Sequence, residues 1–104
     1  MFLNTIVLDT NTQVTPTVAT GQKITTISLF LCNTDSTART VSIYGVPSGG
    51  TPGVGNIIMK DLVIPATDTY KFDIERFVLG PGEKIYVVAD VTSVITATVS
   101  YIIM

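Results

Sequence analysis

Two carboxylates, Asp73 and Glu75, are the first candidates for chemistry in this 104-residue chain, which contains no histidine. Without histidine, general acid–base catalysis falls to carboxylates, and a working pair needs a pocket that pushes their pKa values apart. Asp73 and Glu75 share one face of an expected strand, but Lys71 and Arg76 lie beside them. This arrangement is typical of a solvated ion-pair surface. We therefore expect no catalytic residues and no enzymatic activity.

The remaining reactive or metal-binding side chains are equally isolated. Cys32 is the only cysteine, so an intrachain disulfide is excluded. It ends an apolar run and has no histidine to activate it, which favours a small packed thiol over a nucleophile. The acidic residues do not recur at the spacing of a calcium loop. No metal site and no cofactor are expected from this set: Asp61, Asp68, Asp73, Glu75 and Asp90.

Residues 47–56 are rich in glycine and could be mistaken for a phosphate-binding loop. A P-loop ends in Gly-Lys-Ser/Thr and leads into a helix, so that backbone N–H groups and a lysine meet the phosphates. Here Asn56 leads directly into Ile-Ile-Met. A long exposed hairpin loop is the better interpretation.

Charge and hydropathy exclude two further classes of protein. The net charge is −2, and the six Lys and Arg residues are scattered, so no basic stripe exists to bind nucleic acid. No stretch approaches the roughly 18 uninterrupted apolar residues of a membrane-spanning helix. The start of the chain lacks the basic region of a secretory signal, and we treat it as mature protein.

The elements that must position any site are strands. Residues 23–32 and 39–46 alternate apolar and polar side chains, and residues 33–36, Asn-Thr-Asp-Ser, favour a turn. We predict an antiparallel hairpin here. Phe30 and Tyr44 would point away from the core. The expected core face of the hairpin is Ile27, Leu29, Leu31, Val41 and Ile43.

The rest of the chain repeats this pattern of short strands and turns. About seven strands separated by turns predict an all-β fold, a single antiparallel β-sandwich of the jelly-roll or immunoglobulin-like kind. Residues 1–20 would be an N-terminal arm or edge strand, and residues 21–104 the sandwich domain. Besides the hairpin, strands are expected at 2–8, 57–64, 69–74, 84–91 and from 95 to the end. Residues 15–19 would form a short edge segment, and residues 77–79 lead into a turn at 80–83.

Apolar surface is the main clue to function. Charged residues make up only 13% of the chain, and mean hydropathy is +0.51, although so short a chain buries only about 60–70% of its surface. We expect partners to cover part of that surface; the alternative is a compact β-domain coated with threonine. The N-terminal segment either adds a strand to a neighbour's sheet or pairs within its own. The candidate interface residues are Phe2, Leu3, Ile6, Val7, Leu8, Phe30, Tyr44 and Ile102.

A family resemblance is carried by three segments. They are residues 24–50, with an apolar strand, an Asn-plus-hydroxyl turn, a second strand and Val-Pro-Ser-Gly-Gly; residues 60–66, Lys-Asp-Leu-Val-Ile-Pro-Ala; and residues 77–86, with Pro-Gly-Glu-Lys. This order resembles small β-sandwich virion proteins of tailed bacteriophages. The first twenty residues fall outside the resemblance.

The resemblance implies a structural virion protein, most simply a capsid decoration or cement protein. It implies symmetric copies, for example a trimer, with the major capsid protein or tail components as partners, in the virion and in the host cytoplasm during assembly. The alternative is a tail, fibre or adaptor component. Such a component could bind a receptor or glycan, with Tyr44 or Tyr70 as a stacking platform.

Overall fold

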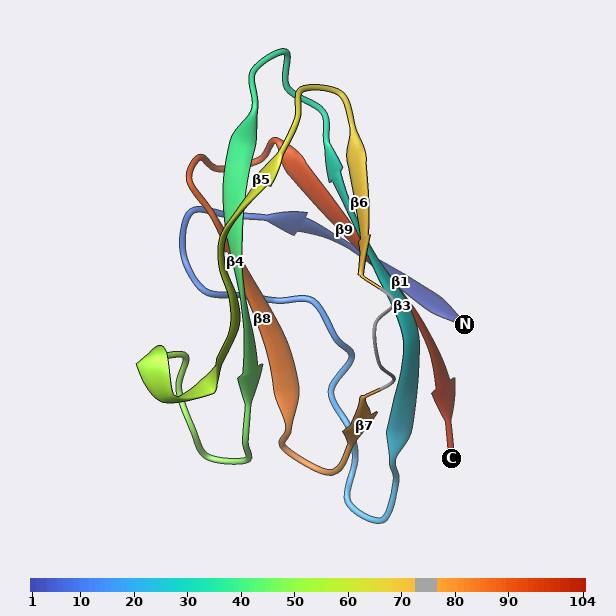
Figure 1. Ribbon diagram of the computed structural model, residues 1–104. Coiled ribbons are helices and arrows are strands. Elements are labelled where there is room, and N and C mark those ends of the chain that lie inside the picture. Colours follow the sequence, from blue (N-terminus) through green and yellow to red (C-terminus); the bar gives the residue numbers. More distant parts are fainter. Residues whose placement is uncertain (73–76) are drawn as a thin grey trace.

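The computed structural model describes residues 1–72 and 77–104 (Figure 1). Four residues for which the sequence suggested a strand end and an ion-pair surface, Asp73, Ile74, Glu75 and Arg76, lie outside the described residues.

The described residues form nine β-strands and one short 3-10 helix, η1 (Val54–Asn56). The all-β prediction is confirmed. The strand count exceeds the expected seven because β2 and β7 are two-residue strands. The strands are β1 (Phe2–Val7), β2 (Thr12–Gln13), β3 (Ile24–Asn33), β4 (Arg39–Val46), β5 (Ile57–Ile64), β6 (Thr69–Phe72), β7 (Val78–Leu79), β8 (Lys84–Ala89) and β9 (Ile95–Ile103).

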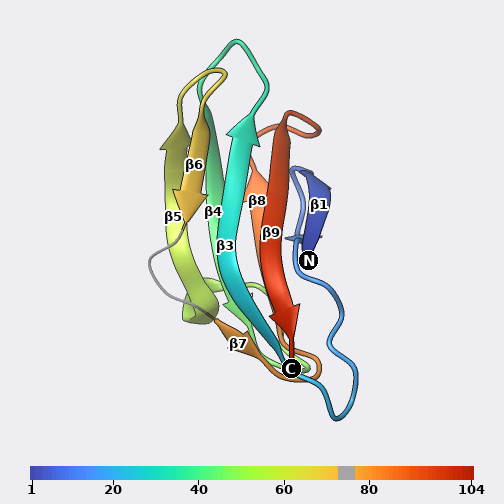
Figure 2. The same cartoon turned by 90° about the vertical axis from the view of Figure 1, so that its right-hand side faces the viewer.

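The strands form two packed antiparallel sheets, which confirms the β-sandwich (Figures 1 and 2). Sheet A has the order β1-β9-β3-β6, and β7 also pairs with β3; sheet B has the order β2-β8-β4-β5. Ile24 and Thr25 pair with both β9 and β7, so β7 lies on the same edge of β3 as β6.

This strand order distinguishes between the two expected topologies. Strands from the two ends of the chain, β1 and β9, are neighbours in sheet A, while β2 and β8 are neighbours in sheet B. This nesting of early strands beside late ones is the jelly-roll arrangement. An immunoglobulin-like sandwich would instead place its last two strands side by side in one sheet, whereas β8 and β9 lie in different sheets.

The core lies between the sheets and is built from the inward side chains of both. Period-two alternation sends every second side chain of each strand into this layer. Phe72 and Phe77 add an aromatic pair with ring centroids 6.1 Å apart. The largest fully buried side chains include Leu31 from β3, Ile43 from β4, Ile64 from β5 and Ile95 from β9.

The predicted hairpin of residues 23–32 and 39–46 is wrong. Both segments are strands, but β3 pairs with β9, β6 and β7, whereas β4 pairs with β5 and β8. The connection between them therefore crosses from sheet A to sheet B. Alternation identified the buried face of each strand correctly at Leu29, Leu31 and Ile43, but it carries no information about which strand lies alongside.

Asn33 explains why the chain crosses here instead of turning back. Its side chain is fully buried, and its amide N–H groups donate to the carbonyls of Thr37 (3.0 Å), Ile64 (3.1 Å) and Pro65 (3.3 Å). Its carbonyl oxygen accepts from the backbone N–H of Asp35 at 3.0 Å. One side chain thus ties the end of β3 to the crossover and to the end of β5 in the other sheet.

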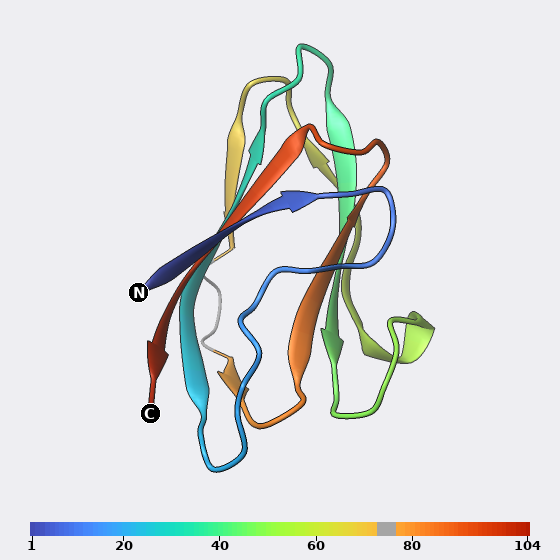
Figure 3. The same ribbon diagram turned by 180° about the vertical axis from the view of Figure 1, so that it is seen from behind.

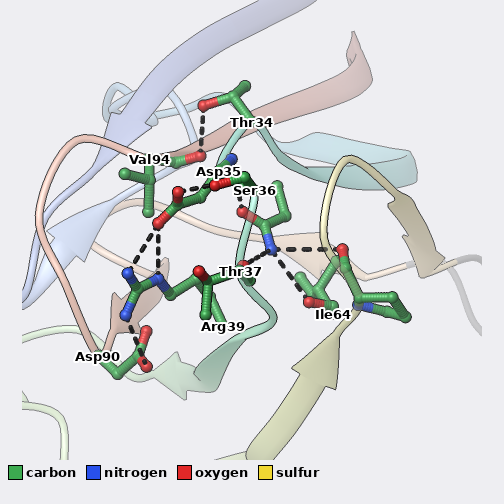
Figure 4. Close-up of polar contacts among 10 residues, drawn as sticks. Thr34, Asp35, Ser36, Thr37, Arg39, Ile64, Asp90 and Val94 are labelled. Carbon is green, nitrogen blue, oxygen red and sulfur yellow. Dashed lines mark hydrogen bonds and ion pairs between the residues drawn. The ribbon is translucent and has the colours of Figure 1, made fainter.

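Ion pairs close the crossover on its solvent side (Figure 4). The Arg39 guanidinium lies 2.7 Å from the Asp35 carboxylate and 3.8 Å from that of Asp90. The hydrogen bond from the Arg39 side chain, followed by that from the Ser36 backbone N–H, lowers the pKa of Asp35 below its ordinary value. Thr34 donates its hydroxyl hydrogen to the Val94 carbonyl at 2.8 Å. The turn chemistry predicted for residues 33–36 therefore serves the crossover.

A β-bulge in β3 corrects the expected core face. The register with β9 shifts between Thr26 and Ser28, so an extra residue, Ile27, enters the strand and reverses its parity. Thr26 is buried as a result, while Ile27 is 38% exposed. The Thr26 hydroxyl is satisfied by the backbone of Phe77, accepting from its N–H at 3.1 Å and donating to its carbonyl at 3.3 Å.

The short edge segment expected at residues 15–19 is not a strand. The strand lies earlier, at Thr12–Gln13, where it pairs with Val87 and Tyr86 of β8. Thr15 instead turns inward and accepts a hydrogen bond from the Ile85 N–H at 3.2 Å. The prediction for residues 47–56 is confirmed, because they connect the antiparallel neighbours β4 and β5 as a hairpin loop.

Candidate interaction surfaces

The described residues offer little material for a reactive site. Among them, no group of three or more His, Cys, Asp or Glu side chains could hold a metal ion. Every buried side-chain nitrogen or oxygen in the described part of the chain has a hydrogen-bond partner. Cys32 is a half-buried free thiol on β3. No described helix is long and apolar enough to cross a membrane.

Two hollows in the described part of the chain are candidate ligand sites. The one between the sheets, bordered by Val14, Leu29 and Phe72, has a volume of about 10 Å³ and is no larger than a water site. A depression of about 330 Å³ lies between the end of β4 and β7 and is mostly apolar. Glu83, one of its two charged lining residues, uses its carboxylate to accept the Gly80 N–H at 2.6 Å. Neither hollow has the convergent polar groups of a small-molecule site.

The outer face of sheet A is a candidate interaction surface. We use this name for the outward residues of its strands, which the register places in cross-strand rows. Hydroxyl side chains follow β9, and apolar side chains lie on β1, on β3 and at the far end of the face. The rows are Phe2, Ser100 and Ser28; Asn4, Thr98, Phe30 and Lys71; Ile6, Thr96, Cys32 and Thr69; and, at the far end, Ile102, Thr25 and Val78, with Ile27 at the bulge.

Charge is nearly absent from this face. Among its described strand residues, Lys71 alone is charged, and it lies at the β6 edge with its Nζ 5.9 Å from the centre of the Phe30 ring. Phe2 is 68% exposed, Ile6 60% and Ile102 51%. A sheet face with little charge that exposes aromatic and branched apolar side chains is typical of a binding surface.

Phe30 and Tyr44 do not form one surface. They were expected on the same side of a hairpin, but β3 and β4 lie in different sheets, so their outward residues are on opposite sides of the sandwich. Tyr44 pairs in register with Tyr86 of β8 on the outer face of sheet B. Tyr86 was missed as a surface aromatic, although its alternation with the inward Ile85 and Val87 would have indicated its direction.

The N-terminal candidates separate into two groups. β1 pairs with β9 of its own sheet and then crosses towards sheet B, where Ala89 of β8 donates its N–H to the Leu8 carbonyl (Figure 3). Phe2 and Ile6 point outward, and Leu8 is 40% exposed. Leu3 packs partly against the core. Val7 is fully buried, so it contributes to folding and offers no surface to a partner.

Comparisons with known proteins add no relative: no protein-family model, curated protein or solved structure matches the chain. A jelly roll hosts many unrelated functions, so the fold by itself does not identify one. The surfaces of the sandwich and the resemblance in its sequence are the basis for a functional proposal.

Proposed function

We propose that this chain is a structural virion protein of a tailed bacteriophage that decorates the capsid and stabilises it through subunit contacts. It acts by binding and performs no catalysis. The observation that supports this proposal most is the outer face of sheet A, a surface of hydroxyl and apolar side chains on which Lys71 alone is charged among the described strand residues.

The size of this face suits a protein partner. The strands β1, β9, β3 and β6 have six, nine, ten and four residues. At about 3.3 Å per residue and about 4.8 Å between strands, they cover roughly 450 Å². Specific protein interfaces bury about 800 Å² per partner, so this face would supply a little over half of one such contact. Its apolar side chains on β1 and β3 supply the hydrophobic contribution, while the hydroxyls of β9 can pair with backbone groups of the partner.

A tail, fibre or adaptor component is the second candidate. Its glycan-binding form is weakened at the aromatics it would use, because Tyr70 packs against the core. Tyr44 faces outward but is only partly exposed, beside Tyr86. No described feature favours this candidate over decoration of the head.

Particle composition tests the proposal. Particles of the virus that encodes the chain are purified, heads and tails are separated, and each fraction is quantified by mass spectrometry. A decoration protein is expected in the head fraction at a fixed ratio to the major capsid protein. Recovery only with tails supports the second candidate, and absence from purified particles contradicts a virion role.

A matched pair of variants tests the surface itself. Phe30→Ser removes an aromatic from the outer face of sheet A, whereas Val54→Ser removes an apolar side chain that is 94% exposed in the β4–β5 loop. Binding to particles that lack the protein should weaken at least about tenfold for Phe30→Ser, as for an interface aromatic, and remain unchanged for Val54→Ser. Equal binding by both variants would show that the capsid contact lies elsewhere.

A further inference from the structure

The free edge of β1 exposes unpaired backbone groups. Among the described strands β9 is its only ladder neighbour, and β1 is the outermost strand of sheet A in Figure 2. The Met1 carbonyl accepts from Tyr101 N–H at 2.9 Å and the Val7 carbonyl from Ser93 N–H at 3.1 Å. In an antiparallel ladder these directions alternate along the strand. The N–H and C=O groups of the even residues Phe2, Asn4 and Ile6 therefore point away from β9.

The other sheet edges are protected against strand addition, and β1 is not. The β5 edge carries Lys60 and Asp61, a left-handed residue (φ 53°) beside register shifts. β2 and β7 have two residues each, and β6 is a four-residue strand that contains Lys71. β1 has six residues, FLNTIV, with no charge, no proline and an unbroken register against β9. Exposed edges of this kind are templates for another strand.

We propose that β1 pairs antiparallel with β1 of a second copy of this chain, about a two-fold axis at Asn4. Only even residues have outward backbone groups, so even residues must pair with even residues. The register that uses all of them sets Phe2 against Ile6 of the second copy and Asn4 against its own equivalent. Each of these three pairs exchanges two main-chain hydrogen bonds.

Residue 8 limits the choice of register. The Leu8 N–H is bonded to the Thr12 hydroxyl at 3.0 Å, and the Leu8 carbonyl accepts from Ala89 N–H at 3.0 Å. A register shifted by two residues towards Leu8 would need these groups. A shift the other way would leave Ile6 without a partner. The register centred on Asn4 therefore makes the most bonds.

The side chains favour the same register. Phe2 and Ile6 are largely exposed and face each other across the axis, and aromatic–branched pairs stabilise adjacent strands. The side-chain oxygen of Asn4, Oδ1, accepts a hydrogen bond from the Thr98 hydroxyl at 2.8 Å, and this bond orients the side-chain amide of Asn4. Its N–H groups can then donate to Asn4 of the second copy. No like charges oppose the pairing.

Such pairing is isologous and therefore yields a dimer, in place of the trimer that the sequence resemblance offered as an example. It does not depend on a virion role, because the argument uses only the edge of β1. It also leaves the outer face of sheet A free, since the second copy adds in the plane of the sheet.

Cysteine cross-linking tests the register. In a Cys32→Ser background, Asn4→Cys places two thiols on directly opposed residues, whose Cα atoms are about 5.5 Å apart, a separation that a disulfide spans. In the matched control, Ile6→Cys, the two thiols are four residues apart along the strand, about 13 Å. We expect an intermolecular disulfide for Asn4→Cys and little for Ile6→Cys. No disulfide at residue 4, or equal yields at both positions, would overturn the proposal.

Mass measurement tests the assembly. In analytical ultracentrifugation, the unmodified chain should have a mass twice that of the 11.1 kDa monomer. Asn4→Lys sets two like charges against each other and should give monomer, whereas Val63→Lys, at an exposed site on the β5 edge, should stay dimeric. A monomeric or trimeric unmodified chain overturns the proposal, as does an Asn4→Lys variant that is folded and dimeric. If Asn4→Lys fails to fold, the cysteine pair decides.

Discussion

At the scale of single residues, the amide of Asn33 contributes most to the crossover between the sheets. Replacing Asn33 with Ala leaves the carbonyls of Thr37, Ile64 and Pro65 without their donor. We expect the free energy of unfolding to fall by about 2–4 kcal/mol, the cost of unsatisfied buried polar groups. Urea denaturation measures the loss. The exposed Asn11→Ala is the control, and an equal change in both variants would mean that the Asn33 bonds contribute nothing.

The Asp35 carboxylate makes stability depend on pH. Hydrogen bonds from the Arg39 side chain and then the Ser36 backbone N–H lower its pKa in the folded state below the ordinary 3.8. The carboxylate therefore stabilises the fold above pH 3.8, and this contribution is lost as pH falls through the lowered pKa. Unfolding midpoints of the parent and Asp35→Asn should converge below pH 3.8. A constant difference down to pH 2 would contradict this assignment.

At the scale of elements, the bulge in β3 predicts an asymmetry between two residues of equal parity. Ile27 is partly exposed and Leu29 is buried. Ile27→Thr should cost less than about 1 kcal/mol, as at a surface position, whereas Leu29→Ala should cost about 2–5 kcal/mol, as in a core. Chemical denaturation of both variants checks the bulge. Similar costs would indicate an unbroken strand with both side chains inside.

β1 is expected to be part of the folding unit. Val7 is fully buried and Leu3 packs against the core, so deletion of residues 1–9 should lower stability by at least about 2 kcal/mol. Thermal unfolding followed by circular dichroism measures this. Asn4→Lys is the control, because it opposes pairing between copies while keeping β1 in its sheet. An undiminished midpoint after the deletion would mean that β1 is a dispensable arm.

Alternation in the sequence predicted strand positions better than strand neighbours. Arg39–Val46 and Ile57–Ile64 were located to the residue, and Leu31 and Ile43 were placed in the core. Alternation records only which face is buried, so the partners of β3 and β4 were missed. The bulge at Ile27 was missed because a single inserted residue leaves no signature in composition.

The candidate surface could be predicted only in part for the same reason. Phe2, Ile6 and Ile102 were suggested because they are apolar and near the termini, and Val7 was included on the same grounds. The alternation of β1 could have separated outward Phe2 from inward Val7. Its place at an unprotected edge depends on pairings between residues far apart in sequence, which no local pattern encodes.

At the scale of the whole molecule, the two proposals use different parts of one sandwich. Pairing through the β1 edge joins two copies in the plane of sheet A, so their outer faces lie side by side and double the surface available to a partner. On the proposed function, the outer face of sheet A, with Lys71 as its one charged described strand residue, would contact the capsid. Sheet B, with Lys60, Asp61 and Lys84 on its strands, would then face solvent.

A cryo-electron microscopy reconstruction of the head of the encoding virus tests the central proposal most directly. We predict density for this jelly roll on the outer surface of the capsid, with the outer face of sheet A against the major capsid protein and the strands of sheet B towards solvent. A complete capsid map with no copy of the sandwich on it, from particles that carry the intact gene, would contradict a role in decorating the head.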